Sequence, residues 1–279
     1  MLQIWFRVYL IAARLLGIRV VWTAHNLVPH QPVFADDRNA RRVLVEQSRA
    51  VIALSEASVA ELASIGARDV RVIPFGAYAQ RQDDTLATTG ARPRLELGNG
   101  DFVAVFIGRI EPYKGVLNLI AAAQRMDVAR PVRVLIGGEC RDAAHRADLC
   151  AAIGNDKRCR LRLEWLSDSE VGAYLQAADV AVFPFTRVTN SSSIVLALCH
   201  GVPVVAPRLR SLIGIPLECG VWYDPDDDGG LERALVRAAN LTHAESSAMR
   251  EAALAYGALL DWAAVGTATA DLYEEVLSR

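Results

Sequence analysis

The chain alternates short runs of apolar residues with longer segments in which apolar positions recur at helical spacing. The runs end in Gly, Pro or polar residues, which is typical of buried β-strands, and the segments between them predict helices. In the first part of the chain we expect an apolar helix, then strands at residues 18–25, 50–55 and 69–78, with a second helix beginning at Ser55.

A second and more regular series starts at residue 102. Strands are expected at residues 102–110, 132–139, 159–166 and 179–185, and a helix followed by a strand within residues 189–207. Further helices are expected at residues 115–126, 143–154, 167–178, 232–241 and 244–277. Regular alternation of strand and helix predicts parallel sheets with helices on both faces, and therefore the α/β fold class.

Residues 79–101 separate the two series, because they are polar, contain glycine and show no periodicity. This stretch is the best candidate for a linker between two α/β domains. We therefore expect a first Rossmann-like domain over residues 1–90, a second over 91–245, and C-terminal helices over 246–279 that pack back toward the first domain.

The amino-acid composition argues against some classes of function but does not indicate a particular one. The 279 residues are 52% hydrophobic and 22% charged, as in ordinary globular proteins, and the net charge of -2 argues against a dedicated nucleic-acid binder. The five cysteines are widely spaced and form no Cys-x-x-Cys pair, so we expect reduced thiols that mostly fill the core. No pattern of His, Cys or Asp suggests a metal site.

The apolar beginning of the chain, residues 1–22, is interrupted by Arg7, Arg14 and Arg19. No apolar run approaches the roughly 20 residues that a membrane-spanning helix needs, and the charges do not follow the order of a signal peptide. We expect a packed helix followed by a strand. Peripheral contact with a membrane surface, through the aromatic residues and arginines of this helix, is the alternative.

One loop that follows a predicted strand carries two cations. Ligands of open parallel sheets bind beyond the carboxyl ends of the strands. The loop GRIEPYKG, from Gly108 to Gly115, follows such a strand and contains Arg109 and Lys114. The planar fork of arginine and the point charge of lysine suit a diphosphate. Neither a P-loop nor a Gly-x-Gly-x-x-Gly motif is present, and two solvated loop charges are the simpler alternative.

A run of hydroxyl and amide side chains, from Thr189 to Ser193, opens the helix that follows another strand. Asn190 or Ser191 is the natural N-cap, and Gly201 marks the end of the helix. The free N–H groups and the dipole of a helix start favour an anion, although simple capping explains the same residues. Two anion-friendly sites at the carboxyl edge of one sheet favour a phosphate site there.

A family resemblance is carried by three segments of the second series: FIGRIEPYKGV, WLSDSEVGAYLQAADVAVFPF and ALCHGVPVVAP. In order and spacing they resemble the nucleotide-sugar domain of glycosyltransferase family 4, enzymes of the GT-B fold. Three segments of the first series are similar to the second half of the family's acceptor domain: VVWTAHN, AVIALSE and VRVIPFG. The resemblance covers nearly the whole chain and implies a GT-B-like pair of Rossmann-like domains, of which the N-terminal, acceptor-side one is incomplete.

The resemblance implies a hexosyltransferase that takes its sugar from a GDP- or UDP-linked donor and needs neither a metal nor another cofactor. Arg109 and Lys114 would bind the donor diphosphate and stabilise the leaving group, and His25 would lie near the transferred sugar. The other donor-binding residues that the resemblance implies are Gly108, Trp165, Leu166, Asn190, Ser191, Ser192 and Ser193.

Two features depart from the family pattern. The family carries two glutamates separated by seven residues, one for the donor sugar and one for the ribose, and Val188 and Leu196 stand at those positions here. The stereochemical outcome, which is retention in the family, is therefore left open. The chain also begins at a helix midway through the acceptor domain, so we expect a fragment, a truncated reading frame, or a compact variant that a partner completes.

Three interpretations of function follow. The leading one is a cytoplasmic glycosyltransferase, in part peripheral at the inner membrane face, that extends a polysaccharide or glycolipid acceptor. A catalytically silent module that binds a nucleotide sugar or a partner protein would also lack the two carboxylates. A sugar-nucleotide epimerase of the same fold should carry more acid and base residues in its cleft, where only His25 stands out.

Overall fold

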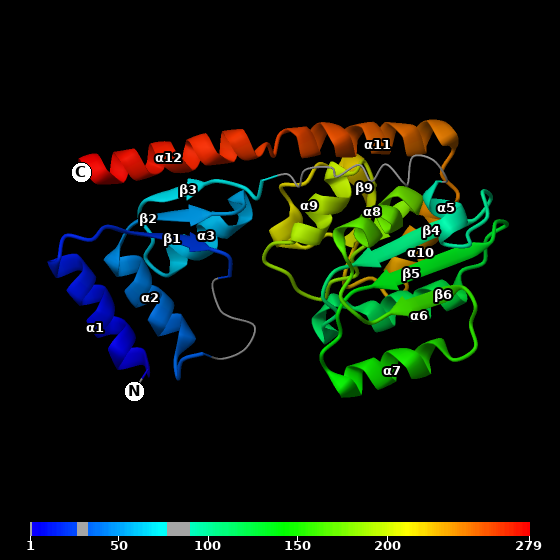
Figure 1. Cartoon of the computed structure of the whole chain (residues 1–279), viewed down its shortest axis with the longest axis horizontal. Coiled ribbons are helices and arrows are strands. Elements are labelled where there is room, and N and C mark those ends of the chain that lie inside the picture. Colours follow the sequence, from blue (N-terminus) through cyan, green and yellow to red (C-terminus); the bar gives the residue numbers. More distant parts are fainter. Residues whose placement is uncertain (1, 27–32, 77–89) are drawn as a thin grey trace. The chain divides into compact units, whose positions relative to one another are not determined.

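The computed structural model describes residues 2–26, 33–76 and 90–279 (Figure 1). The chain divides into two compact units. Unit 1 contains Met1–Gly76, Arg210–Gly214 and Leu260–Arg279, and unit 2 contains Ala77–Leu209 and Ile215–Leu259. Within the described ranges, unit 1 holds a three-stranded sheet and unit 2 a six-stranded sheet, and the strands in both are parallel, which confirms the predicted α/β fold class.

Unit 1 is built on a sheet with the strand order β1-β2-β3. Its strands are β1 Val20–Ala24, β2 Ser48–Ala53 and β3 Val70–Val72, and its helices are α1 Leu2–Leu15, α2 Asp37–Gln47, α3 Glu56–Ser64 and α12 Trp262–Ser278, with the 3-10 turn η2 Arg210–Leu212. The helix predicted to begin at Ser55 is α3, for which Ser55 is the N-cap. The predicted third strand is shorter than expected, and its last two residues, 77 and 78, lie outside the described part of the chain.

Alternate residues of β2 face opposite sides of this sheet, as the pleat requires. Val51 and Ala53 join a core that also contains residues of α2 and α3. On the other face, Ala50 and Ile52 pack with two buried residues of α12, Leu272 and Val276. The last helix of the chain therefore covers one face of the sheet formed by its first strands.

Residues 244–277, which were expected to be helical, form two helices with a break between them. The helix α11, His243–Ala258, ends before α12 begins, and the two belong to different units. Asp261 is the N-cap of α12, and its carboxylate accepts a hydrogen bond from the N–H of Ala263 at 3.2 Å. A side chain that caps a new helix satisfies N–H groups that a continuous helix would have paired internally.

Unit 2 contains the larger sheet, whose strands are β4 Phe102–Ile107, β5 Val132–Gly137, β6 Cys159–Arg162, β7 Val180–Val182, β8 Val204–Pro207 and β9 Gly220–Tyr223. Its helices are α5 Ala91–Arg94, α6 Val116–Arg125, α7 Ala143–Ile153, α8 Asp168–Ala177, α9 Ser192–Cys199, α10 Gly230–Ala239 and α11, with the 3-10 turns η1 Pro112–Lys114 and η3 Leu217–Cys219. All six residues of β4 are buried, as expected for a central strand covered on both faces.

The strand order of this sheet is β6-β5-β4-β7-β8-β9. The first strand of this sheet in chain order is β4. The next two strands, β5 and β6, lie on one side of β4, and the chain then returns so that β7 lies on the other side. The order therefore reverses between β4 and β7, and ligands of open α/β sheets bind in the crevice at the carboxyl ends of such a pair. The loops that follow β4 and β7 are the two anion-friendly segments of the sequence.

The expected linker over residues 79–101 is wrong in its last part. Residues 91–94 form α5, and the side chains of Ala91 and Leu97 are buried in unit 2. Arg92 anchors this segment, because its guanidinium donates to the carboxylate of Asp179 at 3.0 Å and to the carbonyl oxygen of Ala177 at 3.1 Å. Asp179 also accepts the N–H of Val103 at 2.8 Å. A half-buried arginine and two buried apolar side chains thus pack a segment whose polar composition suggested a linker.

The five cysteines are all free thiols, as predicted. Cys140, Cys159, Cys199 and Cys219 are buried and Cys150 is exposed. Burial raises the pKa of the Cys159 and Cys219 thiols to about 11, so these thiols stay protonated and behave as core residues.

Candidate functional site

The loop after β4 is held in one conformation by backbone contacts. Gly108 and Gly115 adopt φ angles of 120° and 70°, which favour glycine, and the 3-10 turn η1 lies between them. The residue Thr186, from the loop after β7, donates to the carbonyl oxygen of Tyr113 through both its N–H (2.9 Å) and its hydroxyl (3.0 Å). The two loops at the switch point are therefore joined, and Arg109 and Lys114 project from a fixed turn.

The helix α9 begins beside this turn. Its N-cap is Ser191, one of the two predicted residues, and the Ser191 hydroxyl accepts a hydrogen bond from the N–H of Ile194 at 3.2 Å. A Cβ placed on Gly108 would lie 2.6 Å from Oγ of Ser193 and 3.7 Å from Nζ of Lys114. The lysine ammonium and the first turn of α9 thus converge on the bare backbone of Gly108.

The charge on Lys114 is destabilised in this position. Burial lowers the pKa of the Lys114 ammonium below its ordinary value, the nearby cation Arg109 lowers it further, and the carboxylate of Glu111 only partly opposes both effects. The two cations on this turn, Arg109 exposed and Lys114 half-buried, form a site that favours a negatively charged ligand, because Glu111 offsets the unfavourable position of the Lys114 charge only in part. A diphosphate would supply the missing charge.

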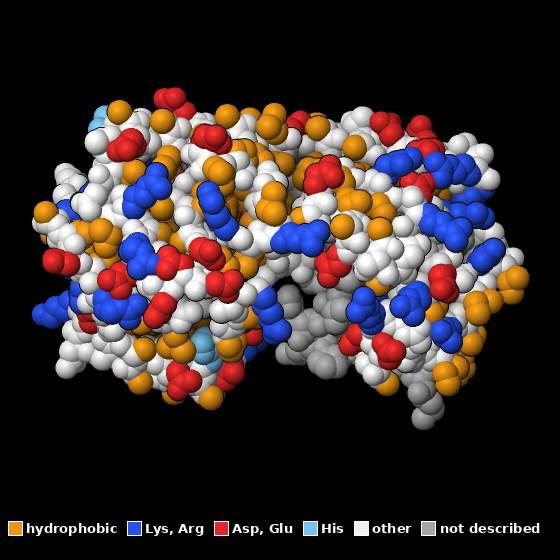
Figure 2. Space-filling view, turned by 180° about the vertical axis from the view of Figure 1, so that it is seen from behind, with side chains coloured by type: hydrophobic (Ala, Val, Ile, Leu, Met, Phe, Trp, Pro, Cys, Tyr) orange, Lys and Arg blue, Asp and Glu red, His pale blue; other side chains and the backbone are white. Residues whose placement is uncertain are grey.

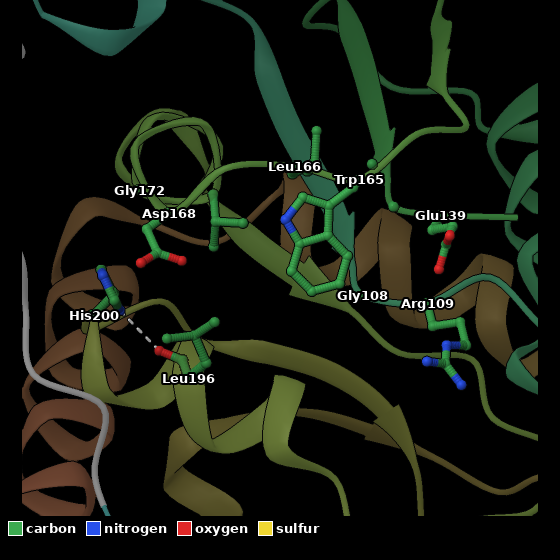
Figure 3. Close-up of a pocket in the computed structure, with 12 residues that line it drawn as sticks. Gly108, Arg109, Glu139, Trp165, Leu166, Asp168, Gly172, Leu196 and His200 are labelled. Carbon is green, nitrogen blue, oxygen red and sulfur yellow. Dashed lines mark hydrogen bonds between the residues drawn. The ribbon is translucent and has the colours of Figure 1, made fainter.

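A pocket of about 370 Å3 opens at the carboxyl ends of these strands. Figure 3 shows Arg109 and Glu139 at one end, Asp168 and His200 at the other, and the indole of Trp165 between them. The Trp165 side chain is 73% exposed although it lines the pocket, so its ring is available to a flat ligand. The complete lining consists of Gly108, Arg109, Gly137, Gly138, Glu139, Trp165, Leu166, Asp168, Val171, Gly172, Leu196 and His200.

Four of the residues predicted for the donor site line this pocket: Gly108, Arg109, Trp165 and Leu166. Lys114 and Ser193 lie next to Gly108 but not in the lining. Ser192 is the first residue of α9, Ser191 is its N-cap, and Asn190 precedes the cap. Seven other lining residues were not predicted from the sequence. They are His200 and the residues at the end of β5 and in α8, which are Gly137, Gly138, Glu139, Asp168, Val171 and Gly172. The pair of glycines at the end of the apolar strand β5, Gly137 and Gly138, was a signal that could have revealed the contribution of this strand.

The predicted residue His25 lies in unit 1, just after β1. Its backbone N–H donates to the carbonyl oxygen of Thr23 at 3.1 Å, and its ring lies 5.9 Å from the ring of Phe75, which follows β3. Both side chains are therefore at the carboxyl edge of the smaller sheet, the edge at which α/β proteins bind ligands.

The two positions at which carboxylates are missing differ in their surroundings. Leu196 is on α9 and lines the pocket, so an apolar side chain stands in the wall at that point. Val188 lies in the loop between β7 and α9 and does not line the pocket. Glu139 and Asp168 are the carboxylates of the lining, and Glu139 is paired with Arg141 at 2.9 Å.

Two further properties of the described residues bear on function. Residues 2–26, 33–76 and 90–279 contain no group of three His, Cys, Asp or Glu side chains that could hold a metal ion. In the same ranges, no helix is long and apolar enough to cross a bilayer.

Comparison with protein families gives two matches on this chain. The family described as "Glycosyl transferases group 1" matches residues 101–240, and the family described as "Glycosyltransferase Family 4" matches residues 3–81. The first match covers the larger sheet, the pocket and α10, and the second covers the beginning of unit 1.

Curated relatives and solved structures agree with these matches. The D-inositol 3-phosphate glycosyltransferase of Corynebacterium efficiens is 28% identical over 92% of this chain and 66% of its own length. The GDP-mannose:glycolipid 4-beta-D-mannosyltransferase of Xanthomonas campestris is 26% identical over 97% of this chain and 72% of its own length. The crystal structure of HepE from Anabaena in complex with UDP has a TM-score of 0.81 at 19% identity, covering 98% of this chain and 77% of that one. The chain thus spans about two thirds to three quarters of these proteins.

Proposed function

Since this chain belongs to the group 1 glycosyltransferases, in glycosyltransferase family 4, we propose that it transfers a sugar from a nucleoside diphosphate sugar to a glycan or glycolipid acceptor. The observation that carries the proposal is the convergence of the Lys114 ammonium and the first turn of α9 on Gly108, at the switch point of the larger sheet. The family membership supports the reaction type, and the pocket supports the donor class.

In the proposed reaction the bond between the anomeric carbon and the diphosphate oxygen breaks, the acceptor hydroxyl oxygen forms the new bond to that carbon, and the proton of this hydroxyl passes to the departing diphosphate. Negative charge develops on the departing diphosphate. Lys114, Arg109 and the free N–H groups of α9 are proposed to stabilise it, because fixed donors in a partly buried site need no reorganisation as the charge grows. This arrangement supplies the charge that a divalent ion supplies in other transferases.

The donor is proposed to be UDP- or GDP-linked. One relative is named for GDP-mannose, and HepE was crystallised with UDP and with UDP-glucose. The exposed indole of Trp165 and the neighbouring backbone of Leu166 are proposed to contact the base, since the ring offers a flat apolar surface in the pocket.

The experiment that tests this function has two stages. Calorimetry with UDP and GDP should show that at least one of them binds, and incubation with the matching sugar donors should release the nucleoside diphosphate. If neither nucleotide binds, the proposal is wrong. Binding without any turnover, with or without acceptor, would instead identify the chain as the catalytically silent module, a reading that the leucine at position 196 favours.

A substitution at His25 separates catalysis from binding. We propose that this side chain contacts the transferred sugar, so His25→Ala is expected to lower turnover by about tenfold, the cost of one lost hydrogen bond, while leaving the nucleotide affinity unchanged. Steady-state release of nucleoside diphosphate and calorimetry measure the two quantities. The variant His243→Ala serves as the control, because His243 is exposed in the first turn of α11 and does not line the pocket. Equal turnover in all three proteins would contradict the role of His25.

The acceptor is proposed to lie in an anionic membrane, and α1 is proposed to bind the protein to the surface of that membrane. This helix packs on α2 through Leu10, whereas Trp5 is 68% and Leu15 82% exposed. Figure 2 shows apolar side chains spread over the surface of the protein. The large apolar side chains of α1 that are exposed are Ile4, Trp5, Val8, Tyr9, Ile11 and Leu15. Arg7 and Arg14 are two helical turns apart and so lie on one stripe. An apolar face beside a basic stripe is typical of helices that lie in the interface of anionic bilayers.

Vesicle binding tests this surface. Co-sedimentation with vesicles that contain anionic lipid should exceed that with purely zwitterionic vesicles, and the double substitution Trp5→Ser and Leu15→Ser should lower the bound fraction by about tenfold, since two apolar side chains no longer enter the bilayer. Leu277→Ser, at a residue of α12 that is 62% exposed, is the matched control and should bind as the wild type does. Binding that ignores lipid charge or the double substitution would contradict the proposal.

A further inference from the structure

The end of the pocket opposite Arg109 presents a side chain that no part of the proposed mechanism uses. Leu196 and His200 both line the pocket, and they lie four residues apart on α9, so they share one face of the helix. His200 is the C-cap residue of α9, eight residues and about 12 Å along the helix axis from its first residue. The phosphates are proposed to lie at the other end of the same helix, so a nucleoside attached to them extends toward His200.

The hydrogen bond of His200 fixes which nitrogen can accept. Nδ1 lies 2.9 Å from the carbonyl oxygen of Leu196. A carbonyl oxygen only accepts hydrogen bonds, so Nδ1 must carry the proton, and in the neutral ring Nε2 is then an acceptor. Figure 3 shows this second nitrogen turned away from Leu196, on the side of the pocket where Asp168 lies. The backbone of α9 thus orients an imidazole acceptor toward the pocket.

The pocket wall next to His200 explains why a hydrogen-bond acceptor at Nε2 matters for binding a ribose. Ribose presents two hydroxyl groups, and each can donate a hydrogen bond. At Leu196 the wall is apolar, so a ribose hydroxyl placed there would lose its bond to water without replacement. One helical turn further on, Nε2 of His200 can accept that hydrogen bond.

We propose that His200 accepts a hydrogen bond from a ribose hydroxyl of the donor nucleotide through Nε2, and that this chain recognises ribose by this imidazole in place of a carboxylate at position 196. The inference rests on the proposed function. It makes His200 a specificity residue for ribonucleotides over deoxyribonucleotides, with no part in bond breaking.

The test compares two ligands that differ only in the ribose hydroxyls. Calorimetry with UDP and 2′,3′-dideoxy-UDP, and with the guanosine pair, gives a preference ratio for each protein. The wild type should prefer the ribose form by about 3- to 10-fold, and in His200→Ala this ratio should fall to about 1, because one net hydrogen bond is removed. The affinity of His200→Ala for the dideoxy form should match that of the wild type, which a general distortion of the pocket would not allow.

Two further variants keep the inference testable if His200→Ala is unstable. His200→Gln retains an oxygen acceptor and should keep part of the preference. Leu196→Glu in the His200→Ala background places a carboxylate one turn earlier on the same helix face and should restore it. His243→Ala, the exposed histidine on α11, should leave the ratio unchanged.

The possible failures are distinguishable. If the wild type binds neither UDP nor GDP, the proposed function is wrong and the inference fails with it. If the wild type binds one of them and His200→Ala keeps the full preference for ribose, the donor site stands and the role of His200 alone is wrong.

Discussion

Replacing Arg109 or Lys114 by alanine is expected to weaken the binding of UDP or GDP by about 10- to 100-fold in each case, since each removes a charge-assisted hydrogen bond to phosphate. Turnover of the sugar donor should fall further than binding does. The charge on the diphosphate grows as the bond to the sugar breaks, so the two cations stabilise the transition state more than the ground state.

Calorimetry and donor turnover measure both effects, and the chain offers a matched control. Lys157 is exposed and lies just before β6, at the amino edge of the same sheet, whereas the pocket lies at the carboxyl edge. Lys157→Ala should therefore bind nucleotide as the wild type does. A loss of less than about twofold in both site variants would mean that the diphosphate is held elsewhere.

Lys114 provides an additional readout through its pKa. Because burial lowers the pKa of this ammonium in the folded protein, its charge opposes folding below that pKa, and the penalty disappears as the pH rises toward the ordinary lysine value of about 10.4. A bound diphosphate favours the charged form and raises the pKa again. At a pH just below the ordinary lysine value, the wild-type protein should therefore take up a proton when the nucleotide binds, and Lys114→Ala should not. Calorimetry in buffers of different ionisation enthalpy detects this difference.

The sequence predicted the parts of this site that are contiguous in the chain. The loop from Gly108 to Gly115 and the start of α9 each follow a short apolar strand, and their chemistry is visible in a few neighbouring residues. Family resemblance added Trp165 and Leu166. The sequence could not show that β5, α8 and the far end of α9 form the walls of the pocket. Which elements meet there depends on which strands are neighbours in the sheet, and the sequence does not give this order.

The same limit explains the errors in the fold. Ala91–Arg94 has the composition of a linker, and tertiary contacts, among them that of Arg92 with Asp179, pack it into unit 2. The break between α11 and α12 had a local signal, the capping residue Asp261, which is weak beside the apolar periodicity on both sides. By contrast, C-terminal helices that pack back toward the first domain were expected from the sequence, and in unit 1 Leu272 and Val276 of α12 pack with Ile52 of β2, which lies more than 200 residues earlier in the chain.

A single methyl group on Gly138 is expected to destabilise unit 2 by about 3 kcal/mol or more. Gly138 follows β5, has a φ of 151°, and donates its N–H to the carbonyl oxygen of Arg162 at 3.0 Å. A Cβ on this residue would lie 1.9 Å from the carbonyl oxygen of Gly108. That neighbour is backbone at the end of the central strand, so it can move only by separating the carboxyl ends of β4 and β5.

Thermal unfolding of Gly138→Ala should accordingly begin about 6 to 12 °C below that of the wild type, given the size of the unit. Nucleotide binding should weaken as well, because the displaced residue Gly108 precedes Arg109. The control for the unfolding temperature alone is Gly172→Ala on α8, where a Cβ would meet nothing within 4 Å and alanine should stabilise the helix by about 0.5 to 1 kcal/mol. If Gly138→Ala unfolds at the temperature of the wild type, the two strand ends do not approach this closely in solution, and the pocket built on them has a different shape.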